Sequence, residues 1–137
     1  MTPYGDGGEN NQEKTFFRSA FRYARSAGRV RMNPEGEIIV VLSTVSPEKS
    51  ESLAKNLLDS RVVACVNVMP VRSYYRWKGE SCDEPEHLLI AKTTKEKVEE
   101  VITAIKSLHP YEVPEIIVLP VIHGYHPYLE WVKQETL

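Results

Sequence analysis

Two rounds of one pattern follow each other along residues 37–124, and they constrain the fold more than any other feature. Each round consists of an apolar run, a segment with helical periodicity and a second apolar run. The apolar runs are "EIIVVLST" (37–44), "RVVACVNVMPV" (61–71), "HLLIAKTT" (87–94) and "EIIVLPVIHG" (115–124). Continuous β-branched runs of this length are typical of buried strands.

The segments between these strands carry helix signals. Ser46, Pro47 and Glu48 supply an N-cap, a proline at the first helical position and an acid in the first turn. Thr93 and Glu96 have the spacing of a capping box. The apolar stripes that follow comprise Leu53, Ala54, Leu57 and Leu58 in the first helix, and Val98, Val101, Ile102, Ile105 and Leu108 in the second.

The order βαβ–βαβ predicts an α+β fold, a ferredoxin-like sandwich with two helices on one face of a four-stranded antiparallel sheet. "HPYLEWVKQ" (126–134) predicts an added short C-terminal helix. Pro70 indicates an edge strand or a bulge. The chain is expected to stay extended over 72–80, to turn at Lys78-Gly79-Glu80 and to form a polar loop over 81–86.

The strands are apolar on both faces, which has a consequence for assembly. An antiparallel sheet with one wet face alternates apolar and polar residues, whereas residues 38–42, 62–66 and 116–119 do not. We therefore expect subunits to pack sheet against sheet. The alternative is that a single chain covers both faces.

Composition excludes several classes of protein. The net charge of −2 argues against a dedicated nucleic-acid binder. Two cysteines, Cys65 and Cys82, are too few for a disulfide framework. No apolar run approaches the roughly 20 residues of a membrane span, and the start does not resemble a secretory signal. The expectation is a soluble, cytoplasmic protein of one folded domain over residues 37–137.

Residues 1–36 form an N-terminal extension of different composition. Residues 1–13 are rich in Gly, Asn and acids, which predicts disorder, and residues 15–31 hold five arginines and no acid. Three interpretations remain open: a basic amphipathic helix on an anionic membrane, an organelle presequence, or a dispensable tail that ends near Met32.

Four segments in register resemble the CutA family of divalent-cation tolerance proteins: "RVVACVNVMP", "SYYRWKGE", "LLIAKTT" and "LHPYEVPEIIVLPV". The resemblance covers residues 38–134. It implies a ferredoxin-like fold and a homotrimer similar to the PII signalling proteins. It also implies binding of divalent metal ions, chiefly copper, and a role in metal-ion tolerance.

The resemblance implies metal ligands at Cys65 and His109. Copper favours thiolate and imidazole ligands. The alternatives are a buried apolar role for Cys65 and a helix C-cap for His109. Some family members carry a cysteine at the position of Ser43 and a histidine at the position of Leu108, so this chain departs from their copper site. His123 and His126 form a weaker pair, and His87 is expected to be structural.

A second group of polar and aromatic residues is expected to line a cleft between subunits. Its members are Tyr75, Trp77, Lys92, Tyr111, Glu112 and Glu115. Lys92 follows an apolar run, so Glu112 or Glu115 is its expected partner. This cleft supports the alternative function, a PII-like regulatory module that binds a small ligand. The competing interpretation is an intersubunit salt bridge without a ligand.

An enzyme is not expected. Cys65 lies in an apolar run, which opposes formation of the reactive thiolate. The sequence contains no Gly-rich phosphate loop and no zinc-type HExxH or CxxC spacing. No organic cofactor is indicated. The hypotheses that remain are a metal-binding trimer, a small-ligand module and a structural trimer.

Overall fold

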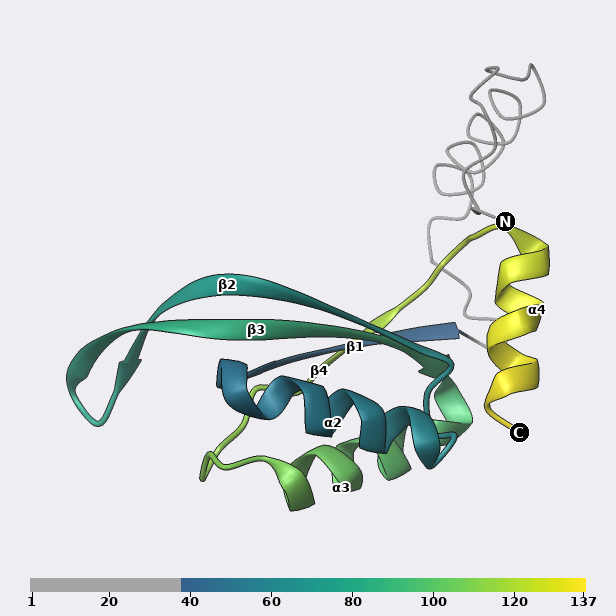
Figure 1. Ribbon diagram of the computed structural model, residues 1–137. Coiled ribbons are helices and arrows are strands. Elements are labelled where there is room, and N and C mark those ends of the chain that lie inside the picture. The colour runs from purple at the N-terminus through teal and green to yellow at the C-terminus, as the bar shows by residue number, and fades with distance from the viewer. Residues whose placement is uncertain (1–37) are drawn as a thin grey trace. The chain divides into compact units, whose positions relative to one another are not determined.

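A computed structural model describes residues 38–137 (Figure 1). The elements are β1 (Ile38–Val45), α2 (Pro47–Asp59), β2 (Cys65–Trp77), β3 (Glu80–Thr94), the 3-10 helix η1 (Lys95–Lys97), α3 (Val98–Leu108), β4 (Ile117–Pro120) and α4 (His126–Glu135). The prediction for residues 1–36 lies outside the described residues.

The four described strands form one antiparallel sheet in the order β2-β3-β1-β4. Helices α2 and α3 cover one face, and α4 lies at one end of the sheet (Figure 1). This is the ferredoxin-like arrangement with an added C-terminal helix, as the sequence predicted. β2 is an edge strand, which explains how it tolerates Pro70.

The main core lies between the sheet and the two helices. Alternate β1 residues, Ile39, Val41 and Val45, point into it and meet Leu57 of α2 and Ile105 of α3. All five side chains are almost fully buried. A smaller cluster at the end of the sheet holds α4 in place through Val132, Ile38 and Ala64. Burial of alternate strand residues against helical stripes is the main stabilising term of such a fold.

The strand residues that alternate with these core residues form the opposite face of the sheet, called here the open face. Val40 and Leu42 on β1 alternate with the core residues, and the register places Ile117 and Leu119 of β4 beside them. Ile117 and Leu119 are 44% and 43% exposed. The described part of a single chain therefore leaves an apolar sheet face in solvent.

β2 and β3 continue beyond the end of β1 as a two-stranded ribbon, the hairpin arm (residues 71–86). The last rung between β1 and β3 joins Val45 to His87, whereas the β2–β3 pairing runs on to Trp77 and Glu80. Lys78 (φ 49°) and Gly79 (φ 80°) form the tip. Two positive φ values match a type I′ turn, whose twist suits a tight hairpin.

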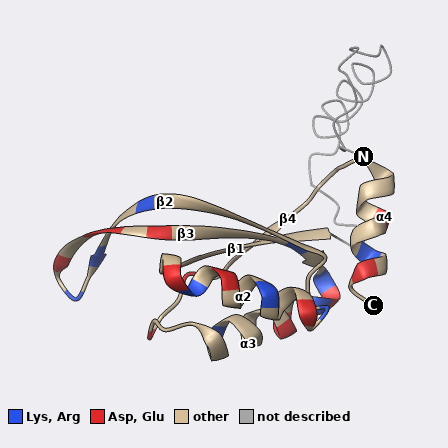
Figure 2. Cartoon of the chain, viewed as in Figure 1, with Lys and Arg blue, Asp and Glu red and all other residues tan. Residues whose placement is uncertain are grey.

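The predicted polar loop over 81–86 is wrong, because these residues pair with β2. The two-residue turn brings the strands into register, and cross-strand contacts then hold them. Arg72 Nε donates to Asp83 Oδ1 at 2.7 Å, and the Tyr75 hydroxyl donates to Glu84 Oε2 at 2.9 Å. Figure 2 shows basic residues on β2 and acidic residues on β3 in this arm. Polar contacts between side chains on the two strands therefore stabilise the ribbon in place of alternating apolar residues.

Other boundaries also differ from the predictions. Arg61 takes a positive φ of 60°, so β2 begins only at Cys65. The Thr93 hydroxyl donates to the Val62 carbonyl at 2.6 Å, and η1 has no side-chain cap, so the predicted capping box is wrong. Ser46 does occupy the N-cap of α2, although its side chain makes no capping hydrogen bond. The last strand covers Ile117–Pro120, the four residues that pair with Ile39–Leu42 of β1.

Candidate ligand pocket

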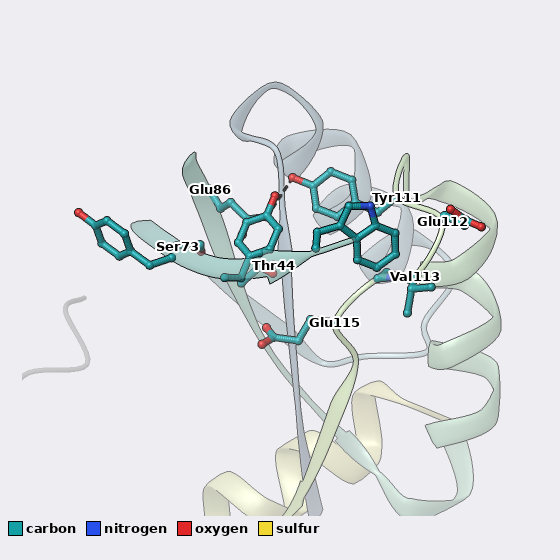
Figure 3. Close-up of a pocket in the computed structure, with 11 residues that line it drawn as sticks. Thr44, Ser73, Glu86, Tyr111, Glu112, Val113 and Glu115 are labelled. Atoms are coloured by element: carbon teal, nitrogen blue, oxygen red, sulfur yellow. Dashed lines mark hydrogen bonds between the residues drawn. The ribbon is translucent and has the colours of Figure 1, made fainter. Parts of the chain in front are cut away.

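A pocket of about 600 Å3 lies between the hairpin arm, the end of β1 and the connection that follows α3. Its lining residues are Thr44, Ser73, Tyr74, Tyr75, Trp77, Glu86, Tyr111, Glu112, Val113, Pro114 and Glu115. Figure 3 shows side chains from the arm and from the connection turned toward one space. The volume lies within the range of small-molecule sites.

His109 fixes the connection to the sheet. It caps α3, with its backbone N–H bonded to the Ile105 carbonyl at 2.8 Å. The Tyr111 backbone N–H donates to His109 Nδ1 at 3.1 Å, so Nε2 carries the proton and donates to the Thr44 carbonyl at 2.6 Å. Pro110 and Pro114 restrict the backbone on either side of Tyr111. The segment is therefore a stiff connector held against the end of β1.

Glu86 and Tyr111 form the innermost polar pair of the pocket. Glu86 is only 4% exposed, and the Tyr111 hydroxyl donates to its Oε2 at 3.0 Å (Figure 3). Burial, followed by the hydrogen bond to Glu86, raises the pKa of Tyr111 to about 12. The phenol therefore stays protonated at neutral pH and acts as a donor to the carboxylate.

Tyr75 and Trp77 belong to the wall that the arm contributes, and Lys78 follows them at the rim, outside the lining. The hydrogen bond to Glu84 is the largest cause that raises the pKa of Tyr75, so this phenol is neutral as well. Lys78 Nζ lies 5.6 Å from the centroid of the Trp77 ring and 3.8 Å from Glu112 Oε2. The rim thus combines an aromatic face, a carboxylate and the chain's own ammonium group.

Five of the six predicted cleft residues line this pocket within one chain: Tyr75, Trp77, Tyr111, Glu112 and Glu115. The sequence patterns do not indicate Glu86, because the polar residues 81–86 predict a loop. The pairing of Val71 with Glu86 places the carboxylate in the ribbon instead. A charged residue directly before the apolar run of β3 was the only available signal.

Lys92 lies elsewhere, on the open face beside Cys65. Its ammonium group donates to Asn67 Oδ1 and lies 3.7 Å from Cys65 Sγ. Cys65 is half-buried, and burial and this thiol raise the pKa of Tyr128 on α4. The expected partners Glu112 and Glu115 are not the partners of Lys92 within one chain. An amide and a thiol satisfy the ammonium instead.

The predicted metal ligands Cys65 and His109 do not meet within one chain. Cys65 pairs with Lys92, and Thr44, which binds His109, pairs with Leu88. Four residues along β3 correspond to about 13 Å, whereas one ion would need both donors within about 2.3 Å of itself. Ser43 is buried and Leu108 is half-exposed, and neither supplies a soft ligand. Among the described residues, no group of three or more His, Cys, Asp or Glu is arranged to hold a metal ion.

The other histidines have different surroundings. His87 Nδ1 lies 2.7 Å from the Ser50 hydroxyl of α2, which is a structural contact between the sheet and a helix. His126 is the first residue of α4. Among residues 38–137, no helix is long and apolar enough to span a membrane.

Comparisons with known proteins agree with this fold. The family described as "CutA1 divalent ion tolerance protein" matches residues 38–135. A divalent-cation tolerance protein CutA from Thermus thermophilus is 41% identical over 101 residues, which are 73% of this chain and 98% of the relative. Protein CutA from Homo sapiens is 39% identical over 74% of this chain, and the match spans 58% of the human protein.

A solved structure extends the agreement to three dimensions. The PII-like protein CutA from Nostoc sp. PCC 7120, in apo form, superimposes with a TM-score of 0.70 at 40% identity, covering 72% of this chain and 97% of that one. The family consists of non-enzymatic tolerance and PII-like proteins, which agrees with the prediction that the chain is not an enzyme. The chain belongs to the CutA1 divalent ion tolerance protein family.

Proposed function

We propose that this chain is a PII-like member of the CutA family that binds a small ligand in the pocket between the hairpin arm and residues 111–115. The observation that carries the proposal is the convergence of Tyr75, Trp77, Tyr111 and the buried Glu86 on one space of about 600 Å3. Concave, aromatic-walled sites with few polar groups are the usual form of ligand sites. Among the described residues, the lining contains no cysteine, histidine, lysine or arginine.

The test is a nuclear magnetic resonance titration of the 15N-labelled chain with small cationic, neutral and anionic aromatic probes. The chain holds two tryptophans, so Trp131 on α4 gives an internal reference for the Trp77 indole signal. Selective shifts of Trp77 and of the amides of residues 111–115 are expected. If no probe of any charge class moves Trp77 more than Trp131, the ligand proposal is wrong.

The second candidate function is binding of copper or another divalent cation. The names of several relatives refer to divalent-cation tolerance. The supporting observation is a free, half-buried thiol at Cys65 on the open face. Because Cys65 and His109 are separated within one chain, a shared ion would need donors from another copy. Calorimetric titration of the reduced, metal-free protein with Cu2+ and Zn2+ tests this. Tight binding that is lost in Cys65→Ser supports the site, and weak binding unchanged in Cys65→Ser contradicts it.

We further propose a homotrimer. Its support is the open apolar face, where Met69, Ile117 and Leu119 are between 43% and 48% exposed in one chain. Exposed apolar surfaces of this kind mark interaction sites. Light scattering coupled to chromatography should give three times the chain mass of 15.6 kDa. A mass of one chain would contradict the proposal.

We propose the cytoplasm as the compartment. The alternative, organelle targeting by the basic segment 15–31, concerns residues outside the described part of the chain. Imaging of the full chain and of a chain that starts at Met32, each fused at its C-terminus to a fluorescent protein, distinguishes the two. An organelle signal from the full chain alone would overturn the cytoplasmic assignment.

A further inference from the structure

The charged residues that line the pocket are all acidic. Three of its lining residues, Glu86, Glu112 and Glu115, are acidic, and among the described residues that line it none is basic. An anionic ligand would therefore meet carboxylates and no ammonium or guanidinium donor inside the pocket. A concave site lined by one sign of charge concentrates ligands of the opposite sign.

Glu86 is buried as a residue, yet neither of its carboxylate oxygens is a fully buried atom without a hydrogen-bond partner. Within residues 38–137, the Tyr111 hydroxyl is the one hydrogen-bond donor to its side chain, at 3.0 Å, and no basic group forms an ion pair with it. A carboxylate offers about four acceptor positions, and a buried charge is costly unless it is paired and hydrogen-bonded. Glu86 lines the pocket, so a ligand with N–H donors and a positive charge would supply further hydrogen bonds and an opposite charge to its carboxylate.

The two phenols do not serve as donors to an anion. Burial and Glu86 raise the pKa of Tyr111 to about 12, and Glu84 holds the hydroxyl proton of Tyr75 at 2.9 Å. Each hydroxyl proton already points to a carboxylate. The phenols therefore leave their ring surfaces for contact with a ligand, and ring surfaces attract cations.

Lys78 offers an independent indication of the ligand chemistry. The chain's own alkylammonium lies over the Trp77 ring, 5.6 Å from its centroid, and 3.8 Å from Glu112 Oε2. An aromatic face and a carboxylate at the rim thus already hold a primary ammonium group. This group belongs to an exposed, flexible side chain, so a ligand can displace it at little cost.

We propose that the pocket is selective for a small organic cation, an ammonium or guanidinium group carried on an apolar body. The cationic group donates to the carboxylate of Glu86, and the body lies against Trp77 and Tyr75. This inference rests on the proposed ligand-binding function and adds the class of ligand.

The experiment compares three probes of similar shape, benzylammonium, benzyl alcohol and phenylacetate, by the Trp77 titration described above. Benzylammonium should bind at least about 10-fold more tightly than benzyl alcohol, since a charge-assisted hydrogen bond in a partly dry site is worth a factor of this size. Phenylacetate should not bind. Equal affinity for the alcohol, or preference for phenylacetate, would overturn the cation inference and leave the ligand-binding function standing.

Variants identify the residue responsible. Glu86→Gln preserves shape and removes the charge, so it should weaken benzylammonium binding about 10-fold or more and leave benzyl alcohol unchanged. Glu51→Gln makes the same change of charge on the exposed face of α2 and should have no effect. Equal losses in both variants would show a general field effect and refute a role for Glu86.

Lys78→Met gives a readout that does not depend on how Glu86→Gln folds. Removal of the competing ammonium should strengthen benzylammonium binding roughly 2- to 5-fold, as expected for an exposed charge pair. Lys49→Met on α2 is the control for net charge. Weaker binding in Lys78→Met, or equal gains in both variants, would contradict the inference.

Discussion

Ser43 allows a test of the core in which the structure predicts a gain in stability. It lies on β1 among the core residues, is 1% exposed, and its hydroxyl has no hydrogen-bond partner among the described residues. A buried hydroxyl without a partner costs about 1–3 kcal/mol in protein mutational data. Ser43→Ala removes this cost.

The substitution also leaves a small void. A void of about 15 Å3, one probe sphere, costs about 0.4 kcal/mol at about 24 cal/mol per Å3. The net expectation for Ser43→Ala is a free energy of unfolding raised by about 1 kcal/mol.

Urea denaturation at fixed protomer concentration measures this change, because stability of an oligomer depends on concentration. The matched control is Thr93→Val, at a buried hydroxyl that does have a partner, the Val62 carbonyl at 2.6 Å. That variant leaves the carbonyl unpaired and should lose about 1–3 kcal/mol. If Ser43→Ala is instead destabilised by as much as Thr93→Val, the hydroxyl has a partner and the reasoning is refuted.

Three further predictions concern the arm, the pocket and the core. Gly79→Ala should destabilise the chain by about 1 kcal/mol through its φ of 80° alone, since an added Cβ meets nothing within 4 Å; an unchanged urea midpoint would contradict this. Absorbance at 295 nm should show a tyrosine that ionises near pH 12 in the wild type and is missing in Tyr111→Phe. Because the pKa of Tyr111 is raised in the folded state, its protonated phenol contributes to the free energy of unfolding fully below pH 10, and this contribution is lost as the pH rises toward 12. Tyr111→Phe should therefore reduce the fall in stability at alkaline pH. Ile105→Ala, at a core position 1% exposed, should cost about 2–5 kcal/mol in the same denaturation assay, and a loss below 1 kcal/mol would argue against the described core.

Local sequence patterns predicted most of the secondary structure and the class of fold. The β-branched runs and the helical stripes, such as Leu53 with Leu57, correctly predicted the strand and helix order and the ferredoxin-like class. These patterns are read within a few residues, because burial on one face imposes a period of 2.0 or 3.6. They failed at residues 81–86, where polar side chains form a strand whose partner lies across a turn.

The sequence predicted the candidate site residues less completely than it predicted the fold. The sequence predicted Tyr111, Glu112 and Glu115 as cleft residues, and the structure places all three around the pocket. Glu86 was missed and Lys92 lies elsewhere. The difference arises because a pocket depends on which side chains of distant segments converge, and single-sequence patterns contain no information on that convergence.

The sequence by itself determined the class of fold, the restriction of Pro70 to an edge strand or a bulge, and the apolar character of both sheet faces. Each of these follows from the chemistry of neighbouring residues. Only the tertiary structure decided that Glu86 is buried beside Tyr111, that Cys65 meets Lys92, and that Cys65 and His109 lie apart. The physical reason is the β2–β3 register: a two-residue turn at Lys78 and Gly79 aligns the strands over their full length and sets the partner of every side chain in the arm.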